Sequence, residues 1–288
     1  MDRLLTKIRK LKTPVVLDMT MSKDQLPPYL LAQEGNYLRA YGRFCLELMD
    51  YLKGEIPAVR YSFSLFSLLG TEGLSWLSKL CSEARTLGYY VFLDVPDIKS
   101  TAQSKIFAEL LFDDLFPWEF DGLILSSYIG TDGYSGYLQL QNDKDLFVML
   151  RTPNKTAGQL QDLMTGGRLV HMAMADELVR AGKSLTGKYG YSRLGGVASA
   201  TAPESLQRLR LKYNELCLVV DGYEAQQPNA KKCACAFDAL GYGGIICVGN
   251  YITEAWKTEL CDETAFLSCA KDAVAKLKKN IARYITIL

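Results

Sequence analysis

Apolar positions along the chain gather in short continuous runs, and each run is followed by a longer segment with the apolar spacing of a helix. The runs are rich in β-branched and aromatic residues. Uninterrupted apolar runs of this length are typical of strands buried on both faces, as in a parallel sheet. The pattern predicts eight strands, over residues 15–19, 58–63, 89–94, 122–126, 146–151, 195–200, 216–221 and 244–248.

The segments between these runs are amphipathic. In residues 74–87, for example, Leu74, Leu77 and Cys81 fall on one helical face. Thr201 stands before a proline and an acid, which predicts a threonine-capped helix start there. The predicted helices cover residues 74–87, 101–112, 136–140, 169–181, 203–213, 230–240 and 264–284, and a basic amphipathic helix covers residues 1–12.

Strands that alternate with helices in one unbroken series predict an α/β fold, specifically a single (β/α)₈ TIM barrel over residues 1–288. The alternative is an open doubly wound sheet, but no Gly-x-Gly-x-x-Gly turn follows the first run. The longest polar connection, residues 154–167, is expected to be a binding loop or lid. Arg151, just before it, would either contact a ligand or anchor this loop.

Composition narrows the function classes. The net charge is +1 and 23% of the residues are charged, which favours neither a nucleic acid nor an anionic membrane as partner. No apolar run approaches the roughly 20 residues of a membrane span. The N-terminus lacks the continuous apolar core of a signal peptide, so a cytoplasmic protein with eight reduced cysteines is expected.

Chemistry in such barrels sits at the carboxyl ends of the strands. Asp18, Asp94 and Asn250 stand at or just past the ends of predicted strands, and Asp97 follows three residues after Asp94. Acids in these positions indicate a site, although a turn fixed by Pro96 with a helix cap would explain Asp94 and Asp97 equally well.

Six motifs near these strand ends resemble orotidine 5′-monophosphate decarboxylases of the longer bacterial form. Each motif alone is weak, but all six occur in the family's order and at matching spacing. They are LGTEGL (69–74), LDVPDIKSTA (93–102), SYIGTD (127–132), RTPNKTAGQLQDL (151–163), GGVASATAPESL (195–206) and GYEAQQPN (222–229).

The resemblance implies a (β/α)₈ barrel and a lyase of pyrimidine biosynthesis that decarboxylates a 6-carboxypyrimidine nucleotide without metal or organic cofactor. It also implies a homodimer, because the family builds each site across a two-fold interface. The implied ligand is a pyrimidine nucleotide or another small phosphorylated molecule.

Carried over by position, Asp18 matches the family's ribose-binding aspartate, and Asp94 and Asp97 match two acids of its Lys-Asp-Lys-Asp array. Arg60 falls where the family has the first lysine of that array. The proton-donating lysine has no counterpart, because the stretch between Asp94 and Asp97 is two residues shorter. Lys99 could replace it only if its ammonium lies in the barrel mouth beside Asp94. Arg60 itself is either a remnant of the charge array or, the interpretation we favour, part of a structural ion pair with Asp18 or Asp94.

The ligand-binding positions that match the family are Thr101, Ser127 and Gln226. Asn250 stands near the place of the family's phosphate-binding arginine, and Glu224 adds a negative charge near a would-be phosphate. We therefore predict a decarboxylase-like protein with little or no decarboxylase activity. The alternative is a non-catalytic barrel that is retained for ligand or partner binding.

Overall fold

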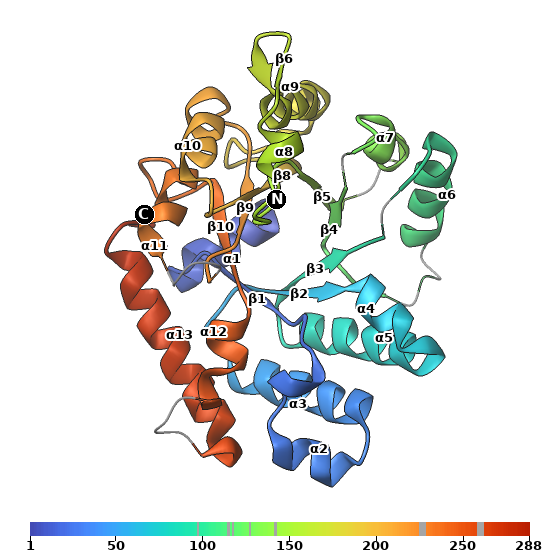
Figure 1. Cartoon of the computed structure of the whole chain (residues 1–288), viewed down its shortest axis with the longest axis vertical. Coiled ribbons are helices and arrows are strands. Elements are labelled where there is room, and N and C mark those ends of the chain that lie inside the picture. The colour runs from blue at the N-terminus through green and yellow to red at the C-terminus, as the bar shows by residue number, and fades with distance from the viewer. Residues whose placement is uncertain are drawn as a thin grey trace.

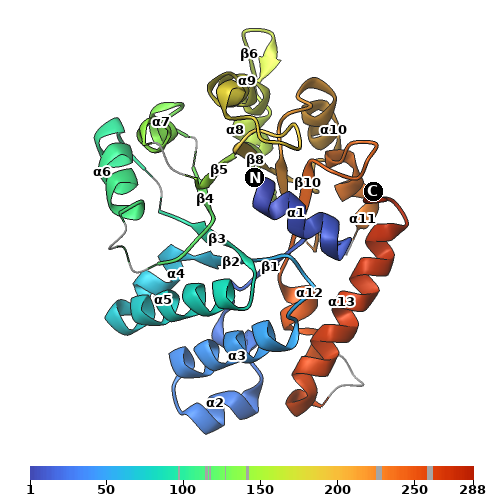
Figure 2. The same cartoon turned by 180° about the vertical axis from the view of Figure 1, so that it is seen from behind.

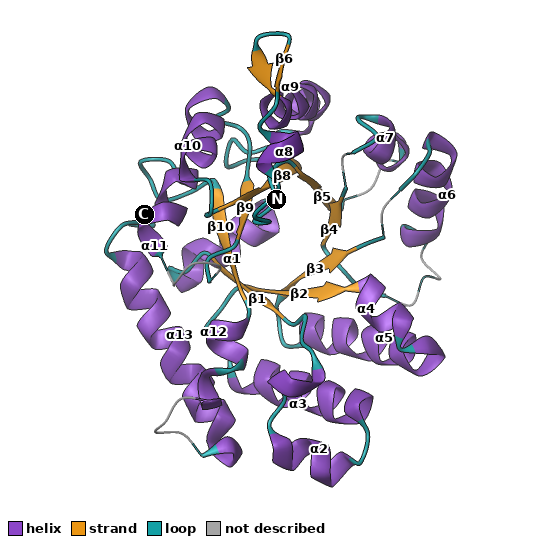
Figure 3. Cartoon of the chain, in the orientation of Figure 1, coloured by secondary structure: helices purple, strands orange, loops and turns teal. Residues whose placement is uncertain are grey.

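The computed structural model describes residues 1–96, 98–113, 116, 118–126, 128–140, 143–224, 229–257 and 262–288. Among these residues, eight parallel strands close into a barrel in the order β1-β10-β9-β8-β5-β4-β3-β2. Helices surround this ring of strands, as Figure 3 shows. The (β/α)₈ barrel predicted from the hydrophobic pattern is therefore confirmed, and the open sheet is excluded.

Each barrel strand is short and almost wholly buried, as expected for a parallel sheet covered by helices. Figure 1 shows the elements in chain order from blue to red. The barrel strands are β1 (Val15–Asp18), β2 (Ala58–Ser62), β3 (Tyr90–Asp94), β4 (Gly122–Leu125), β5 (Asp145–Met149), β8 (Leu194–Ser199), β9 (Leu218–Asp221) and β10 (Gly244–Val248), and a separate hairpin pairs β6 (Met164–Thr165) with β7 (Arg168–Leu169).

The helices around the barrel differ widely in length. The α-helices are α1 (Asp2–Leu11), α2 (Pro28–Glu34), α3 (Tyr37–Tyr51), α4 (Phe63–Leu68), α5 (Gly70–Thr86), α6 (Thr101–Leu111), α7 (Asp132–Gln139), α8 (Gly158–Gln161), α9 (Val170–Gly182), α10 (Pro203–Lys212), α11 (Ala230–Cys233), α12 (Asn250–Thr253) and α13 (Phe266–Ala282). None of the helices among the described residues combines the length and the apolar character that a membrane crossing would require.

Aromatic rings fill part of the barrel interior. The ring centroids of Tyr90 and Phe92 are 4.8 Å apart, and those of Phe92 and Phe147 are 5.1 Å apart. Glycines make room for these rings, since a Cβ added at Gly195 would lie 2.7 Å from Phe147 Cδ1. These described residues form a packed core inside the barrel, so a ligand is expected at its ends.

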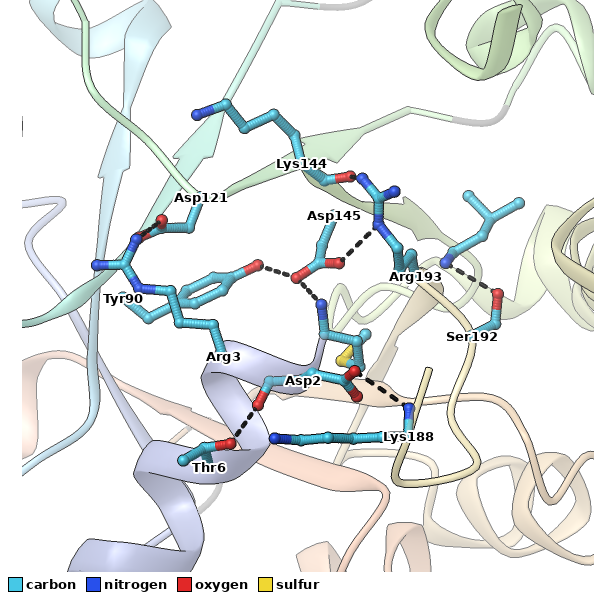
Figure 4. Close-up of polar contacts among 12 residues, drawn as sticks. Asp2, Arg3, Thr6, Tyr90, Asp121, Lys144, Asp145, Lys188, Ser192 and Arg193 are labelled. Carbon is cyan, nitrogen blue, oxygen red and sulfur yellow. Dashed lines mark hydrogen bonds and ion pairs between the residues drawn. The ribbon is translucent and has the colours of Figure 1, made fainter. Parts of the chain in front are cut away.

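The amino-terminal ends of the strands are closed by α1, which lies across this end of the barrel in Figure 2. Asp145, the first residue of β5, is buried and accepts a hydrogen bond from the Tyr90 hydroxyl at 2.7 Å. Asp145 also pairs with the amino group of Met1, and Arg3 pairs with Asp121 just before β4 (Figure 4). These contacts attach α1 to the amino-terminal ends of the strands.

The predicted strands agree with the observed ones to within a residue or two, whereas several helix predictions need correction. Helices α2 and α3 were not predicted. Residues 230–240 were predicted as one helix but hold only the short α11 and a 3₁₀ turn over Ala234–Ala236. The polar connection 154–167 contains α8 and part of the β6–β7 hairpin.

Two chemical expectations are wrong. Thr201 does not cap α10: the N-cap residue is Ala202 without a side-chain cap, and the Thr201 hydroxyl lies 2.8 Å from the Ser199 hydroxyl instead. Cys269 is disulfide-bonded, so the cysteines are not all reduced. Cys45, Cys81 and four other described cysteines are free thiols, as expected.

Candidate functional site

A cavity of about 400 Å³ opens at the carboxyl ends of β1, β2, β9 and β10. This volume falls in the range of small-molecule sites. Three carboxylates and one guanidinium are in its wall, and no lysine or histidine belongs to the lining that the described residues form. The lining residues are Asp18, Thr20, Arg60, Pro153, Asp221, Gly222, Tyr223, Glu224, Cys247, Gly249 and Asn250.

Arg60 reaches this cavity because side chains alternate between the two faces of a strand. Its neighbour Tyr61 packs outward: the Tyr61 hydroxyl lies 2.8 Å from Met49 Sδ and its ring meets Phe66. Arg60 therefore points inward, where its side chain is only 10% exposed. The parallel register places it beside Asp18 of β1.

The Arg60 guanidinium holds the carboxylates of three different strands. Its Nη2 lies 2.6 Å from Asp94 Oδ2, and its Nη1 lies 2.9 Å from Asp221 Oδ1. The same Nη1 is 3.9 Å from Asp18 Oδ2 and 3.6 Å from the sulfur of Cys247. The expected ion pair between Arg60 and Asp94 is present, and Asp18 is a more distant member of the same cluster.

The electrostatics of this cluster keep Arg60 charged. Burial alone would lower the pKa of Arg60, but Asp221, followed by Cys247, Asp18 and Asp94, raises the pKa well above its ordinary value. Burial raises the pKa of Asp221, and Arg60 opposes that rise. A guanidinium held in this way cannot release a proton near neutral pH, so Arg60 cannot act as a general acid.

A second polar arrangement joins the loops that follow β9 and β10. Glu224, three residues past β9, accepts hydrogen bonds from the backbone N–H groups of Gly249 at 3.0 Å and Tyr251 at 2.8 Å. Burial raises the pKa of Glu224, and these N–H groups partly offset the rise. The Glu224 carboxylate thus satisfies the first backbone donors after β10.

The other predicted site residues lie in different places. Asn250 lines the cavity and its Oδ1 accepts a hydrogen bond from Gln25 Nε2 at 3.0 Å. Thr101 begins α6 and is exposed, and it does not line the cavity. Lys99 is also exposed, is absent from the cavity lining and forms no ion pair with a described carboxylate.

Three further predictions fall on residues that the structure does not describe. These are Asp97, Ser127 and Gln226. Their proposed roles remain predictions from the family resemblance.

Arg151 anchors the loop after β5, as one of its two interpretations expected. Its Nε and Nη2 each lie 3.0 Å from a carboxylate oxygen of Asp162. Gln161 Oε1 adds a hydrogen bond from the Thr152 N–H at 2.9 Å. A bidentate pair of this kind fixes the loop, and Arg151 is absent from the described cavity lining.

Sequence reasoning did not assign roles to Asp221 and Cys247. Asp221 ends β9 and Cys247 is the penultimate residue of β10, and Asp221 was recognisable only as one strand-end acid among several. The partner of Arg60 depends on the strand order around the closed barrel, which brings β9 within reach of β2 across the mouth. That order cannot be read from local pattern.

The fold and this mouth define a (β/α)₈ barrel with a charged small-molecule site at the carboxyl ends of its strands. No family model matches the chain. Orotidine 5′-phosphate decarboxylase of Rhodopirellula baltica is 33% identical over 241 residues, which cover 82% of this chain and 80% of the relative. The enzyme of that name from Clostridium perfringens is 28% identical over 287 residues, covering 99% and 98% of the two chains.

Solved structures agree in fold. Orotidine 5′-monophosphate decarboxylase of Plasmodium berghei superposes with a TM-score of 0.77 at 14% identity, covering 97% of this chain and 98% of that one. The Methanocaldococcus jannaschii protein complexed with the inhibitor BMP gives 0.60 at 15% identity, with 93% and 98% covered. These structures agree with the chain in fold, and the Rhodopirellula baltica relative shows that the chain belongs to the orotidine 5′-phosphate decarboxylase family.

Proposed function

We propose that this chain is a decarboxylase-family barrel with little or no decarboxylase activity, retained to bind a ligand in its mouth. The observation that supports the proposal is the Arg60 cluster. In a mouth built for decarboxylation, charges are preorganised around the reacting carbon and a proton donor is within reach. Here the cationic group of the mouth is committed to Asp94 and Asp221, at 2.6 and 2.9 Å.

The described residues of the mouth offer no candidate for the proton donor of the reaction. No lysine or histidine lines the cavity in the part of the chain that is described, and the exposed Lys99 does not line it. Arg60 has a raised pKa because of its acidic neighbours. Protonation of a carbanion-like carbon would therefore have no side-chain source of suitable acidity among these residues.

The test is incubation of the purified protein with orotidine 5′-monophosphate while the ultraviolet absorbance of the orotate ring is followed. We expect no turnover above background. Ordinary enzyme rates, about 1–10³ per second, would refute the proposal. The Arg60→Met variant, purified in parallel, controls for decarboxylase carried over from the host, and the Clostridium perfringens relative serves as the positive control.

We also propose that the protein is a homodimer, as the family resemblance implies. Exposed apolar side chains support this proposal: Leu68 on α4 is 85% exposed, Leu110 on α6 is 57% exposed, and Tyr128, between β4 and α7, is 81% exposed. Light scattering of the purified protein measures its mass directly, and a monomer at micromolar concentration would contradict the proposal.

A further inference from the structure

The Glu224 carboxylate occupies backbone groups that barrels of this kind commonly offer to anions. In (β/α)₈ barrels the loops after the seventh and eighth strands frequently bind phosphate through backbone N–H groups. In this chain those strands are β9 and β10. The N–H groups of Gly249 and Tyr251, in the connection that follows β10, both donate hydrogen bonds to Glu224 Oε1.

An external phosphate would have to displace Glu224 to use these donors. The displaced Glu224 carboxylate would still be held near the cavity by the loop after β9, close to the negative charge of the phosphate. Burial already raises the pKa of Glu224, and Asp18 adds to the rise. The loop after β9 therefore contributes an acid to the side of the cavity where a phosphate would need a cation.

The other charged residues that line the cavity also disfavour an anionic ligand. Asp18 and Asp221 also line it, whereas Arg60, the one cationic side chain in the described lining, already pairs with Asp221. The negative charges of these carboxylates repel an anionic ligand. Ionised carboxylates only accept hydrogen bonds, so a complementary ligand brings hydroxyl or amino donors and no negative charge.

We propose that Glu224 determines ligand specificity: as an internal anion on the N–H groups of Gly249 and Tyr251, it excludes phosphorylated ligands from the mouth. The mouth then takes an uncharged, hydroxyl-bearing molecule of the nucleoside class. The volume of about 400 Å³ suits such a molecule. The ligand class rests on the proposed function, since it assumes a mouth that binds without catalysing decarboxylation.

The test measures binding of uridine and of uridine monophosphate by calorimetry for the wild type and for Glu224→Ala and Glu224→Gln. We expect the wild type to bind uridine more tightly than uridine monophosphate. In Glu224→Ala, affinity for uridine monophosphate should rise by at least roughly tenfold, the equivalent of about one charge-assisted hydrogen bond. Affinity for uridine should change little.

Glu224→Gln separates charge from hydrogen bonding, because its amide oxygen can still accept from both N–H groups. The affinity of Glu224→Gln for uridine monophosphate should fall between those of the wild type and Glu224→Ala. The glutamine variant also provides a test if the alanine variant is unstable. Glu254→Gln is the matched control: Glu254 pairs with Lys257 at 3.3 Å just after α12 and is not part of the described cavity lining.

Two results would overturn the inference. One is wild-type affinity for uridine that does not exceed that for uridine monophosphate, and the other is no gain for the nucleotide in either Glu224 variant. Both leave the absence of turnover untouched. Conversely, turnover of orotidine 5′-monophosphate by the wild type would refute the proposed function by a separate measurement.

Discussion

Replacing Arg60 by methionine should destabilise the protein strongly, and more so as the pH rises. Methionine keeps an apolar stem of similar reach but removes the guanidinium that pairs with the carboxylates of Asp94 and Asp221. Removing one partner of a buried ion pair typically costs about 3–5 kcal/mol. Because the Asp94 side chain is 32% exposed, solvent screens part of its loss. We expect the lower end, about 3 kcal/mol.

The sign of the pH dependence follows from Asp221. Burial raises its pKa even with Arg60 present, and Arg60 opposes that rise. Without Arg60 the native pKa of Asp221 rises further, while its pKa in the unfolded chain stays at about 3.9. Between the two values the native state holds a proton that the unfolded chain has released. Stability of the variant therefore falls with rising pH, by up to about 1.4 kcal/mol per pH unit for one carboxyl.

Urea unfolding at pH 5 and pH 8 measures both effects. With a slope of about 3 kcal/mol per molar urea, the midpoint of Arg60→Met should lie about 1 M below that of the wild type, and further below at pH 8. Adding Asp221→Asn should recover part of the loss. Arg180→Met, whose arginine is 71% exposed beside Glu177, should change the midpoint little.

Equal midpoints for wild type and Arg60→Met at pH 8 would refute this reasoning. So would a loss of stability that is the same at both pH values. Either result would mean that the acids of the mouth do not depend on Arg60 for compensation.

Two further predictions concern polar groups away from the mouth, the buried Arg210 and the partly buried Asp176. Arg210 donates to five backbone carbonyls, including those of Leu216 and Gly243 at 2.6 Å each. A lysine has only three donors, so Arg210→Lys should lower the free energy of unfolding by about 2–4 kcal/mol. A urea midpoint equal to that of the wild type would contradict this. Burial opposes ionisation of Asp176, but hydrogen bonds from Lys212, Tyr213 and Arg168 outweigh burial and lower the pKa of Asp176. The ionised Asp176 therefore adds to stability above its unfolded pKa, and this contribution is lost as the pH falls through its folded pKa. Asp176→Asn should therefore cost about 1 kcal/mol at pH 7 and progressively less below pH about 4, and a cost that persists at low pH would count against the argument.

The barrel could be predicted because its strands are buried on both faces and therefore appear in the sequence as continuous apolar runs. The β10 run, for instance, was predicted to the residue as Gly244–Val248. The helices were harder to predict. Residues 230–240 have helical composition, but only Ala230–Cys233 forms an α-helix, followed by a 3₁₀ turn. Pro203 fixed the start of α10 without help from Thr201, whose hydroxyl meets Ser199 instead.

The members of the site could be predicted only in part. Strand-end position identified Asp18 and Asp94, and the substitution of lysine by arginine drew attention to Arg60. The partner Asp221 lies 161 residues from Arg60 in sequence, so only the closed strand order brings the two together. Glu224 could be recognised as an added charge near the expected phosphate site, but not as a hydrogen-bond acceptor for Gly249 and Tyr251.

The two substitutions at the mouth act in the same physical sense. An active site carries charges and donors that are held in place but left for the substrate or transition state to satisfy. Here Arg60 satisfies Asp94 and Asp221, and Glu224 satisfies the donors after β10, so both sets are compensated within the chain. They act on different steps, however, because the Arg60 cluster bears on proton transfer whereas Glu224 bears on phosphate recognition. Removing Glu224 should therefore restore nucleotide binding without restoring decarboxylation, and a Glu224→Ala variant that turned over orotidine 5′-monophosphate would show that the Arg60 cluster is not what prevents the chemistry.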